Sequence, residues 1–159
     1  MTQAQYPPRN TDSPAMKVKP ERTEWRDKDY SKRHREWSPE LTMTDVDALE
    51  FNCRTNEPVA LIELKKDTAV WNDPKEPSNL AQIALAERAG VPMFGVRYSH
   101  DLSWYYVAAL SSHAKRLLPD RIRITEKAYE RFLLWLRGPK KSVALETADG
   151  GTYRTPEAI

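Results

Sequence analysis

Residues 44–66, TDVDALEFNCRTNEPVALIELKK, constrain the fold more than any other stretch of the chain. Two strands are predicted there, at about 44–52 and 58–65, and the polar turn between them contains Asn56 and Glu57. We therefore expect the two strands to lie side by side at the start of the folded part of the chain.

Charged side chains gather on these two predicted strands. Because side chains alternate between the faces of a strand, Asp45 and Asp47 would share one face of the first strand, and Glu63 and Lys65 one face of the second. Clustered carboxylates cost free energy unless a cation or a charged substrate joins them, and a divalent metal is the usual solution. The alternative is a pair of solvated strand ends, with Lys65 and Lys66 neutralising the aspartates.

The rest of the chain continues an alternation of helices and strands. The pattern predicts a helix after Ser78 that ends at Gly90 and a second helix over 125–137, with strands at 93–99 and 104–111 between them. A strand, a helix and a strand at this spacing indicate a right-handed crossover between parallel strands.

These residues and their spacing resemble the PD-(D/E)xK nuclease superfamily, which includes restriction endonucleases, Holliday-junction resolvases and RecB-type nuclease domains. Asp47 stands 16 positions before the Glu63-x-Lys65 triplet, and apolar residues flank both. Thr44 and Val46, rather than proline, precede the two aspartates. The resemblance implies an α/β fold with a restriction-endonuclease-like core, in which helices flank a central mixed sheet of four or five strands.

The resemblance also implies roles for the clustered residues. Asp47 and Glu63 would bind Mg²⁺, for which Mn²⁺ could substitute, together with the main-chain carbonyl of Leu64. Lys65 would orient the attacking water or help to deprotonate it. Asp45 would bind the same metal or a second one, and which aspartate is the main ligand stays open.

Two further residues match accessory positions of the superfamily. Gln82, on the helix after the Glu-x-Lys strand, matches a glutamine that RecB-like members place near the active site. Glu36, on a helix predicted over about 25–37, matches an acidic ligand of some members. A polar residue on a helix face and a surface carboxylate are the respective alternatives.

Candidate DNA contacts lie in a basic stretch before the first strand. Residues 1–38 hold nine Lys or Arg and six Asp or Glu, a net charge of +3, whereas the rest of the chain has a net charge of −1. The candidates are Lys32, Arg33 and Arg35, with Lys66 on the second strand, because contacts to phosphates dominate nucleic-acid affinity. A solvated basic helix face is the alternative, and the aromatic residues Trp71, Trp104, Tyr105 and Tyr106 are either base-stacking or packing residues.

Composition sets the remaining bounds. Residues 1–24 carry few large apolar residues and are expected to form a disordered or loosely docked arm, followed by a nuclease-like domain over 25–138 and a hairpin or tail over 139–159. The single cysteine, Cys53, excludes an intrachain disulfide and favours a reducing cytoplasm. We expect no membrane span and, with only five glycines, no loop for a nucleotide triphosphate.

The resemblance to the nuclease superfamily thus implies a small metal-dependent deoxyribonuclease, and we expect it to act on branched, recombination or repair intermediates of DNA. A homodimer would supply two active sites for two strands, and a phage or mobile element would suit such a stand-alone domain. The alternative is a catalytically inactive nuclease-fold module that binds nucleic acid or a protein partner.

Overall fold

The computed structural model describes residues 33–34, 36–38, 43–69, 75–118, 121–138 and 141–157. The chain divides into two compact units, residues 1–42 and 43–159. The predicted arm over 1–24 lies outside the described residues. The second unit extends past the predicted boundary at 138, because the last strands bury Leu145 in the same core as the sheet.

A five-stranded mixed sheet with flanking helices makes the second unit an α/β structure. Its strands, in spatial order, are β1 (Ala48–Asn52), β2 (Glu57–Lys66), β3 (Met93–Tyr98), β4 (Trp104–Ala109) and β5 (Ile122–Thr125). The pair β2 and β3 is parallel, and the other three neighbouring pairs are antiparallel. This is the expected class, with the crossover where the sequence predicts it.

The first two strands form a hairpin whose turn depends on Asn56. Its φ of 58° lies in the left-handed region, which asparagine tolerates better than most residues. The Asn56 amide donates to the carbonyl oxygen of Asn52 at 2.7 Å and closes the turn. The resulting register pairs Ala48 with Ile62, and this pairing sets which residues of β2 stand beside the start of β1.

Helix α2 (Pro77–Ala89) makes the crossover from β2 to β3. It begins one residue before the predicted cap Ser78, because Pro77 fits the first helical turn, where no amide donor is needed. The N-cap is Glu76, without a side-chain cap. Gly90 ends the helix with a φ of 70°, as the sequence predicts.

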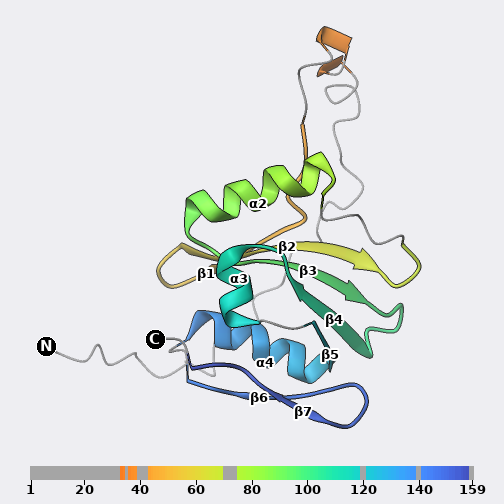
Figure 1. Cartoon of the computed structure of the whole chain (residues 1–159), viewed down its shortest axis with the longest axis vertical. Helices are drawn as coiled ribbons and strands as arrows, with labels where there is room; N and C mark the ends of the chain where they lie inside the picture. The colour runs from red at the N-terminus through yellow and green to blue at the C-terminus, as the bar shows by residue number, and fades with distance from the viewer. Residues whose placement is uncertain are drawn as a thin grey trace, which may run out of the picture. The chain divides into compact units, whose positions relative to one another are not determined.

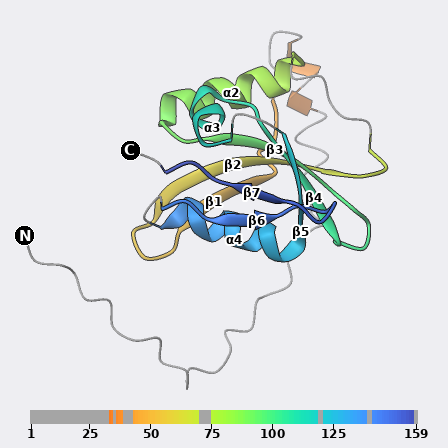
Figure 2. The same cartoon turned by 60° about the horizontal axis from the view of Figure 1, so that its bottom comes forward.

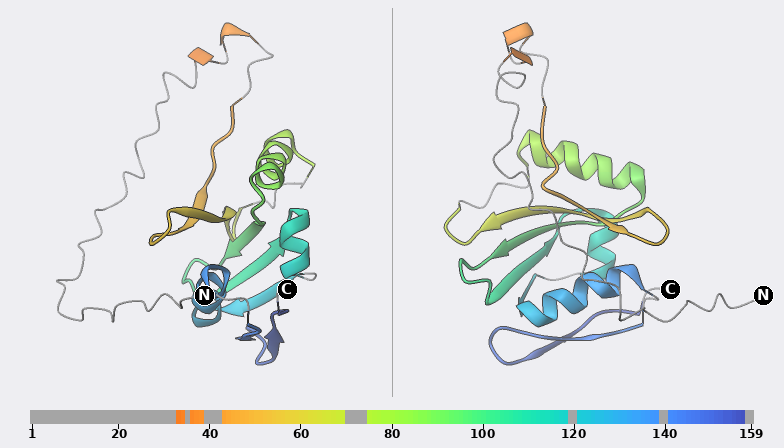
Figure 3. Two further views of the ribbon diagram at one scale, coloured as in Figure 1. Left: turned by 90° about the vertical axis from the view of Figure 1, so that its left-hand side faces the viewer. Right: turned by 180° about the vertical axis from the view of Figure 1, so that it is seen from behind.

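Helices α2 and α4 (Glu126–Arg137) lie on opposite sides of the sheet (Figures 1 and 3). The larger core lies on the α4 side and contains Ile62, Phe94, Val107 and Phe132 with their neighbours. The smaller one, on the α2 side, is formed by buried Leu61, Ala86, Val91 and Met93. Alternation therefore sends Glu63 and Lys65, which follow Leu61 at steps of two, to the face that α2 covers.

Two short elements escaped the sequence pattern, whereas the hairpin that is one of the alternatives expected for 139–159 is present. Helix α3 (Ser112–Leu117) and strand β5 contain six and four residues, too few to establish a period. Strands β6 (Ala144–Glu146) and β7 (Thr152–Arg154) form a separate hairpin beside α4 (Figure 2). Within the described part of the chain, we find no helix with the length and apolar character needed to cross a membrane.

Candidate metal centre and basic hollow

The predicted carboxylates meet at the junction of β1 and β2. Asp47 Oδ2 accepts a hydrogen bond from the Leu64 amide at 2.9 Å, across 17 positions of sequence. Asp45 and Asp47 both precede β1, so the prediction that they share a strand face is wrong. The strand starts at Ala48 because the Asp47 side chain, rather than its backbone, bonds Leu64.

Glu63 and Lys65 form an ion pair on the α2 side of the sheet. Lys65 Nζ lies 2.6 Å from Glu63 Oε1, and the two side chains are 25% and 12% exposed. The hydrogen bond to Glu63 raises the pKa of the Lys65 ammonium, against a smaller opposing effect of burial, and Asp47 adds to the rise. Glu63 faces Gly95 on β3, so that no β3 side chain stands directly beside its carboxylate.

Gln82 of α2 completes this group. Its side-chain amide nitrogen donates to Glu63 Oε2 at 3.2 Å and to the main-chain oxygen of Asp45 at 3.1 Å. The residue is only 3% exposed, and its Oε1 is buried without a hydrogen-bond partner among the described residues. Gln82 thus holds the segment before β1 against the Glu63 carboxylate, as an accessory residue would.

The donor set fits a magnesium ion that keeps several waters. Asp47 and Glu63 supply two carboxylates. The carbonyl of Leu64 points to the same edge as its amide, since both groups of one strand residue face the same way. Magnesium commonly binds through one or two carboxylates plus water and substrate oxygens. No group of three His, Cys, Asp or Glu side chains suited to a metal occurs among the residues that the structure describes.

The other predicted site residues belong to the first unit, lie outside the described residues or stand on the opposite face of β2. Glu36 belongs to the first unit, where its Oε2 pairs with Arg33 Nη1 at 3.2 Å. Lys32 and Arg35 lie outside the described residues. Lys66 is exposed and, by alternation, stands on the face opposite Lys65.

A basic hollow on the same sheet face as Lys65 was not predicted. Its volume is about 510 Å³, and its lining consists of Arg97, Trp104, Tyr106, Arg121 and Arg123. The cross-strand register aligns four side chains in one row over β2 to β5: Lys65, Arg97, Tyr106 and Arg123. Sequence reasoning missed it because the arginines come from two segments, β3 and the start of β5 with the residue before it, which are far apart in the sequence, so no basic run marks the hollow.

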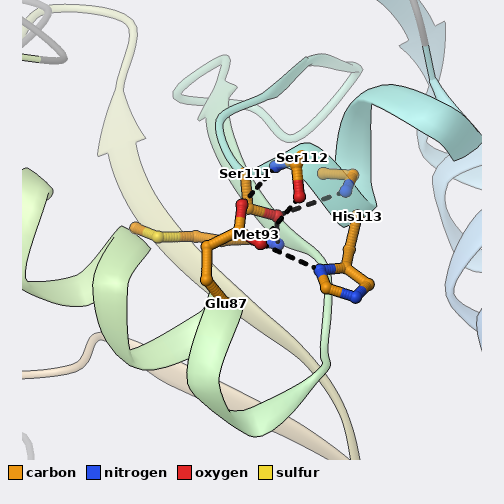
Figure 4. A network of polar contacts seen from close by, with 6 residues as sticks. Glu87, Met93, Ser111, Ser112 and His113 are labelled. Atoms are coloured by element: carbon orange, nitrogen blue, oxygen red, sulfur yellow. Dashed lines mark hydrogen bonds and ion pairs between the residues drawn. The ribbon is translucent and has the colours of Figure 1, made fainter.

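A second polar cluster lies at the other end of α2 (Figure 4). Glu87 accepts from the amide of Ser112 at 2.5 Å and from its hydroxyl at 2.7 Å, and His113 Nδ1 lies 3.1 Å away. The hydrogen bonds from Ser112 lower the pKa of Glu87. Since Ser112 and His113 both bond Glu87, they form no nucleophile and base pair. The cluster fastens α3 to α2.

Comparison of the chain with protein-family models, with curated proteins and with solved structures gives no match.

Proposed function

We propose that this protein is a magnesium-dependent nuclease that hydrolyses DNA phosphodiester bonds, with a core of the restriction-endonuclease type. One observation carries the proposal: Asp47, Glu63, Lys65 and Gln82 converge at one point of the sheet from three separate elements. The acids and the amine needed for phosphodiester hydrolysis stand together there, beside a buried amide that positions one of them.

The free-energy cost of burying these polar groups supports a functional role for them. Glu63 and Lys65 are mostly buried, and burying charges costs free energy that a purely structural sheet edge can avoid with apolar residues. Gln82 Oε1 adds a buried acceptor without a partner among the described residues. Such costs are typical of sites that a substrate or a cofactor completes.

Each residue then has a chemical task. When bound, Mg²⁺ supplies positive charge to the phosphate and lowers the pKa of water. Asp47, Glu63 and the Leu64 carbonyl would hold it, and Gln82 would keep Glu63 in place. Lys65 would orient the water that forms the new phosphorus–oxygen bond and offset the negative charge on the phosphate while the bond to the leaving oxygen breaks.

We propose branched or recombination and repair intermediates of DNA as the substrates. Two copies of the chain would act together where both strands are cut, because each copy carries one site.

A catalytically inactive module of the same fold is the second candidate, and the ion pair favours it. Lys65 Nζ already neutralises Glu63 at 2.6 Å, and Asp47 is occupied by the Leu64 amide at 2.9 Å. The cluster is therefore satisfied in part without any cation, as in a module that only binds nucleic acid or a protein.

The test is cleavage of linear, single-stranded, flapped and four-way DNA with Mg²⁺ or Mn²⁺, with EDTA and the Glu63→Gln variant as controls. The proposal expects metal-dependent cutting that Glu63→Gln abolishes while circular dichroism stays unchanged. Absence of cutting on every substrate, with no binding of either metal by calorimetry, would favour the inactive module instead.

A further inference from the structure

The basic hollow is open to solvent and lies on the same face of the sheet as Glu63 and Lys65 of the candidate metal centre. All five lining residues come from β3, from β4 and from the start of β5, and none is acidic. Another cavity, of about 610 Å³, has a mixed lining instead, which includes Glu57, Glu157 and Arg116. Of these two cavities, the hollow is the one that combines a single sign of charge with aromatic rings.

Three guanidinium groups in one hollow repel each other unless an anion joins them. Arg121 and Arg123 are exposed. Arg97 is anchored by the main-chain oxygens of Asp67 and Ala69, and its Nε is buried without a hydrogen-bond partner among the described residues. Arginine presents a planar fork of donors that matches phosphate oxygens, so a phosphate is the anion that this lining suits.

The aromatic rings add a second kind of contact. Trp104 and Tyr106 lie on the same face, and the guanidinium carbon of Arg123 is 4.3 Å from the centre of the Trp104 ring. Flat rings interleaved with arginines are typical of single-strand binding surfaces, where bases stack on the rings and phosphates bind the cations. A duplex keeps its bases stacked on one another, so that their faces are not available to the rings.

The distance to the metal centre suits one continuous strand. Lys65 and Arg123 are separated by three strand spacings, roughly 14 Å at about 4.8 Å each. At the ~3.4 Å per nucleotide of a strand stacked as in a duplex, this corresponds to at most about four nucleotides. A strand lying along the row could thus contact Lys65 and the hollow at once.

We propose that the hollow binds a single-stranded segment of nucleic acid, with phosphates on Arg97, Arg121 and Arg123 and a base against Trp104 or Tyr106. The inference rests on the proposed function in that it assigns the hollow to the same substrate. It gives the enzyme a preference for DNA that has an unpaired strand beside the cleaved bond.

The test measures binding by fluorescence anisotropy in EDTA, so that no cleavage interferes. The probe is a labelled oligothymidylate of about 12 nucleotides, within the ~4–16 nucleotides that single-strand binding folds cover. Arg121→Ala/Arg123→Ala is compared with Arg131→Ala/Arg154→Ala, a matched pair of exposed arginines on α4 and β7. We expect the first pair to weaken binding at least tenfold and to lower the slope of log affinity against log salt by about 1.4, or ~0.7 per lost contact. The control pair should leave both values unchanged.

Trp104→Leu separates stacking from charge. We expect it to weaken single-strand binding about tenfold, because one stacked base contributes ~1–3 kcal/mol, and to leave binding of a duplex of matched length unchanged. An equal loss for both probes would overturn the single-strand assignment. If Arg121→Ala/Arg123→Ala keeps the wild-type affinity and the wild-type salt slope, the hollow is not a binding site.

The outcomes also separate this inference from the nuclease proposal. Arginine-dependent binding by a protein that cuts no DNA would uphold the hollow and reject the nuclease. Cleavage that Glu63→Gln abolishes, but that Arg121→Ala/Arg123→Ala leaves unchanged on unpaired substrates, would uphold the nuclease and reject the hollow.

Discussion

Two glutamates that contact residues of α2 or belong to it, Glu63 and Glu87, differ in how many unfilled acceptors lie around them. Glu87 accepts hydrogen bonds from the Ser112 amide and hydroxyl and lies beside His113, so its neighbours are donors supplied by the protein. Glu63 also meets protein donors, Lys65 and Gln82, but a second carboxylate, Asp47, is bonded to the next residue, Leu64. Gln82 Oε1 has no partner among the described residues. The Glu87 cluster is complete as it stands, whereas the Glu63 cluster has acceptors to spare.

This difference teaches how to separate a structural carboxylate from a candidate catalytic one. A carboxylate whose acceptor sites are filled by amides and hydroxyls fastens elements together, as Glu87 fastens α3 to α2. A carboxylate that has a second carboxylate near the same lysine, and an amide oxygen without a partner beside it, offers more acceptors than the protein fills. Burial alone would not distinguish the two cases, because both side chains are only partly exposed.

Replacing each glutamate by glutamine tests the difference between the two sites most directly. Glu63→Gln should lower the cleavage rate by more than the ~10–100-fold that loss of a supporting residue of a metal site costs, since it removes a ligand. Glu87→Gln should cleave at the wild-type rate but melt at a lower temperature. Single-turnover cleavage and thermal unfolding, measured on both variants, test the pair. Equal rates for the two variants would contradict the assignment.

Lys65 and its neighbour Lys66 provide the next contrast, because they stand on opposite faces of β2. Lys65→Met should reduce the rate by ~10²–10³-fold, as expected for a group that stabilises developing charge. Lys66→Met, which removes the same charge from an exposed position, should have little effect on the chemical step. Rates at saturating DNA check this, because they exclude differences in DNA affinity, and a similar loss in both variants would contradict a specific role of Lys65 in the chemical step.

Gln82→Met removes the amide that holds Glu63 and keeps the volume of the side chain. The expected result is a ~10–100-fold increase in the Mg²⁺ concentration needed for half-maximal cleavage, because Glu63 loses its orientation. The rate at saturating Mg²⁺ should change less. A metal titration of cleavage measures both quantities, and an unchanged requirement for Mg²⁺ would reduce Gln82 to a packing residue.

The Glu87 cluster should also respond to pH. Hydrogen bonds from Ser112 lower the pKa of Glu87 below its ordinary value of 4.5. A lowered pKa in the folded state means that the contribution to stability is present above pH 4.5 and is lost as pH falls through the lower folded value. Melting temperatures between about pH 6 and about pH 3 should therefore fall more steeply for the wild type than for Glu87→Gln. Parallel curves would show that Ser112 does not stabilise the ionised carboxylate.

Much of the α/β arrangement could be predicted because its signals are local. Alternation placed Glu63 and Lys65 on one face of a strand, Gly90 marked the end of α2, and Thr125 marked the start of α4, where its hydroxyl accepts from the Ala128 amide. Each signal lies within a few residues of the feature that it marks. The sequence could therefore place the charged pair without any knowledge of the sheet.

Other features depend on register and could not be predicted. Asp47 bonds Leu64 only because the hairpin pairs Ala48 with Ile62, which places both aspartates before the strand. The hollow needs Arg97, Tyr106 and Arg123 to align across three strands. The basic stretch that could be predicted, around Arg33, consists of residues that are neighbours in the sequence. The arginines of the hollow are neighbours only in the folded sheet.

The single parallel pair has a consequence for how the chain folds. The antiparallel neighbours β1–β2 and β3–β4 are joined by short turns and can form from nearby residues, whereas β2 and β3 meet only after α2 has crossed between them. Contacts between distant residues form late, because closing a longer loop costs more entropy. A growing chain would thus hold two finished hairpins before Gln82 reaches Glu63 and before Lys65 joins Arg97. The candidate site would therefore form only once the crossover is in place, so that a chain without it carries the charged residues but not their contacts.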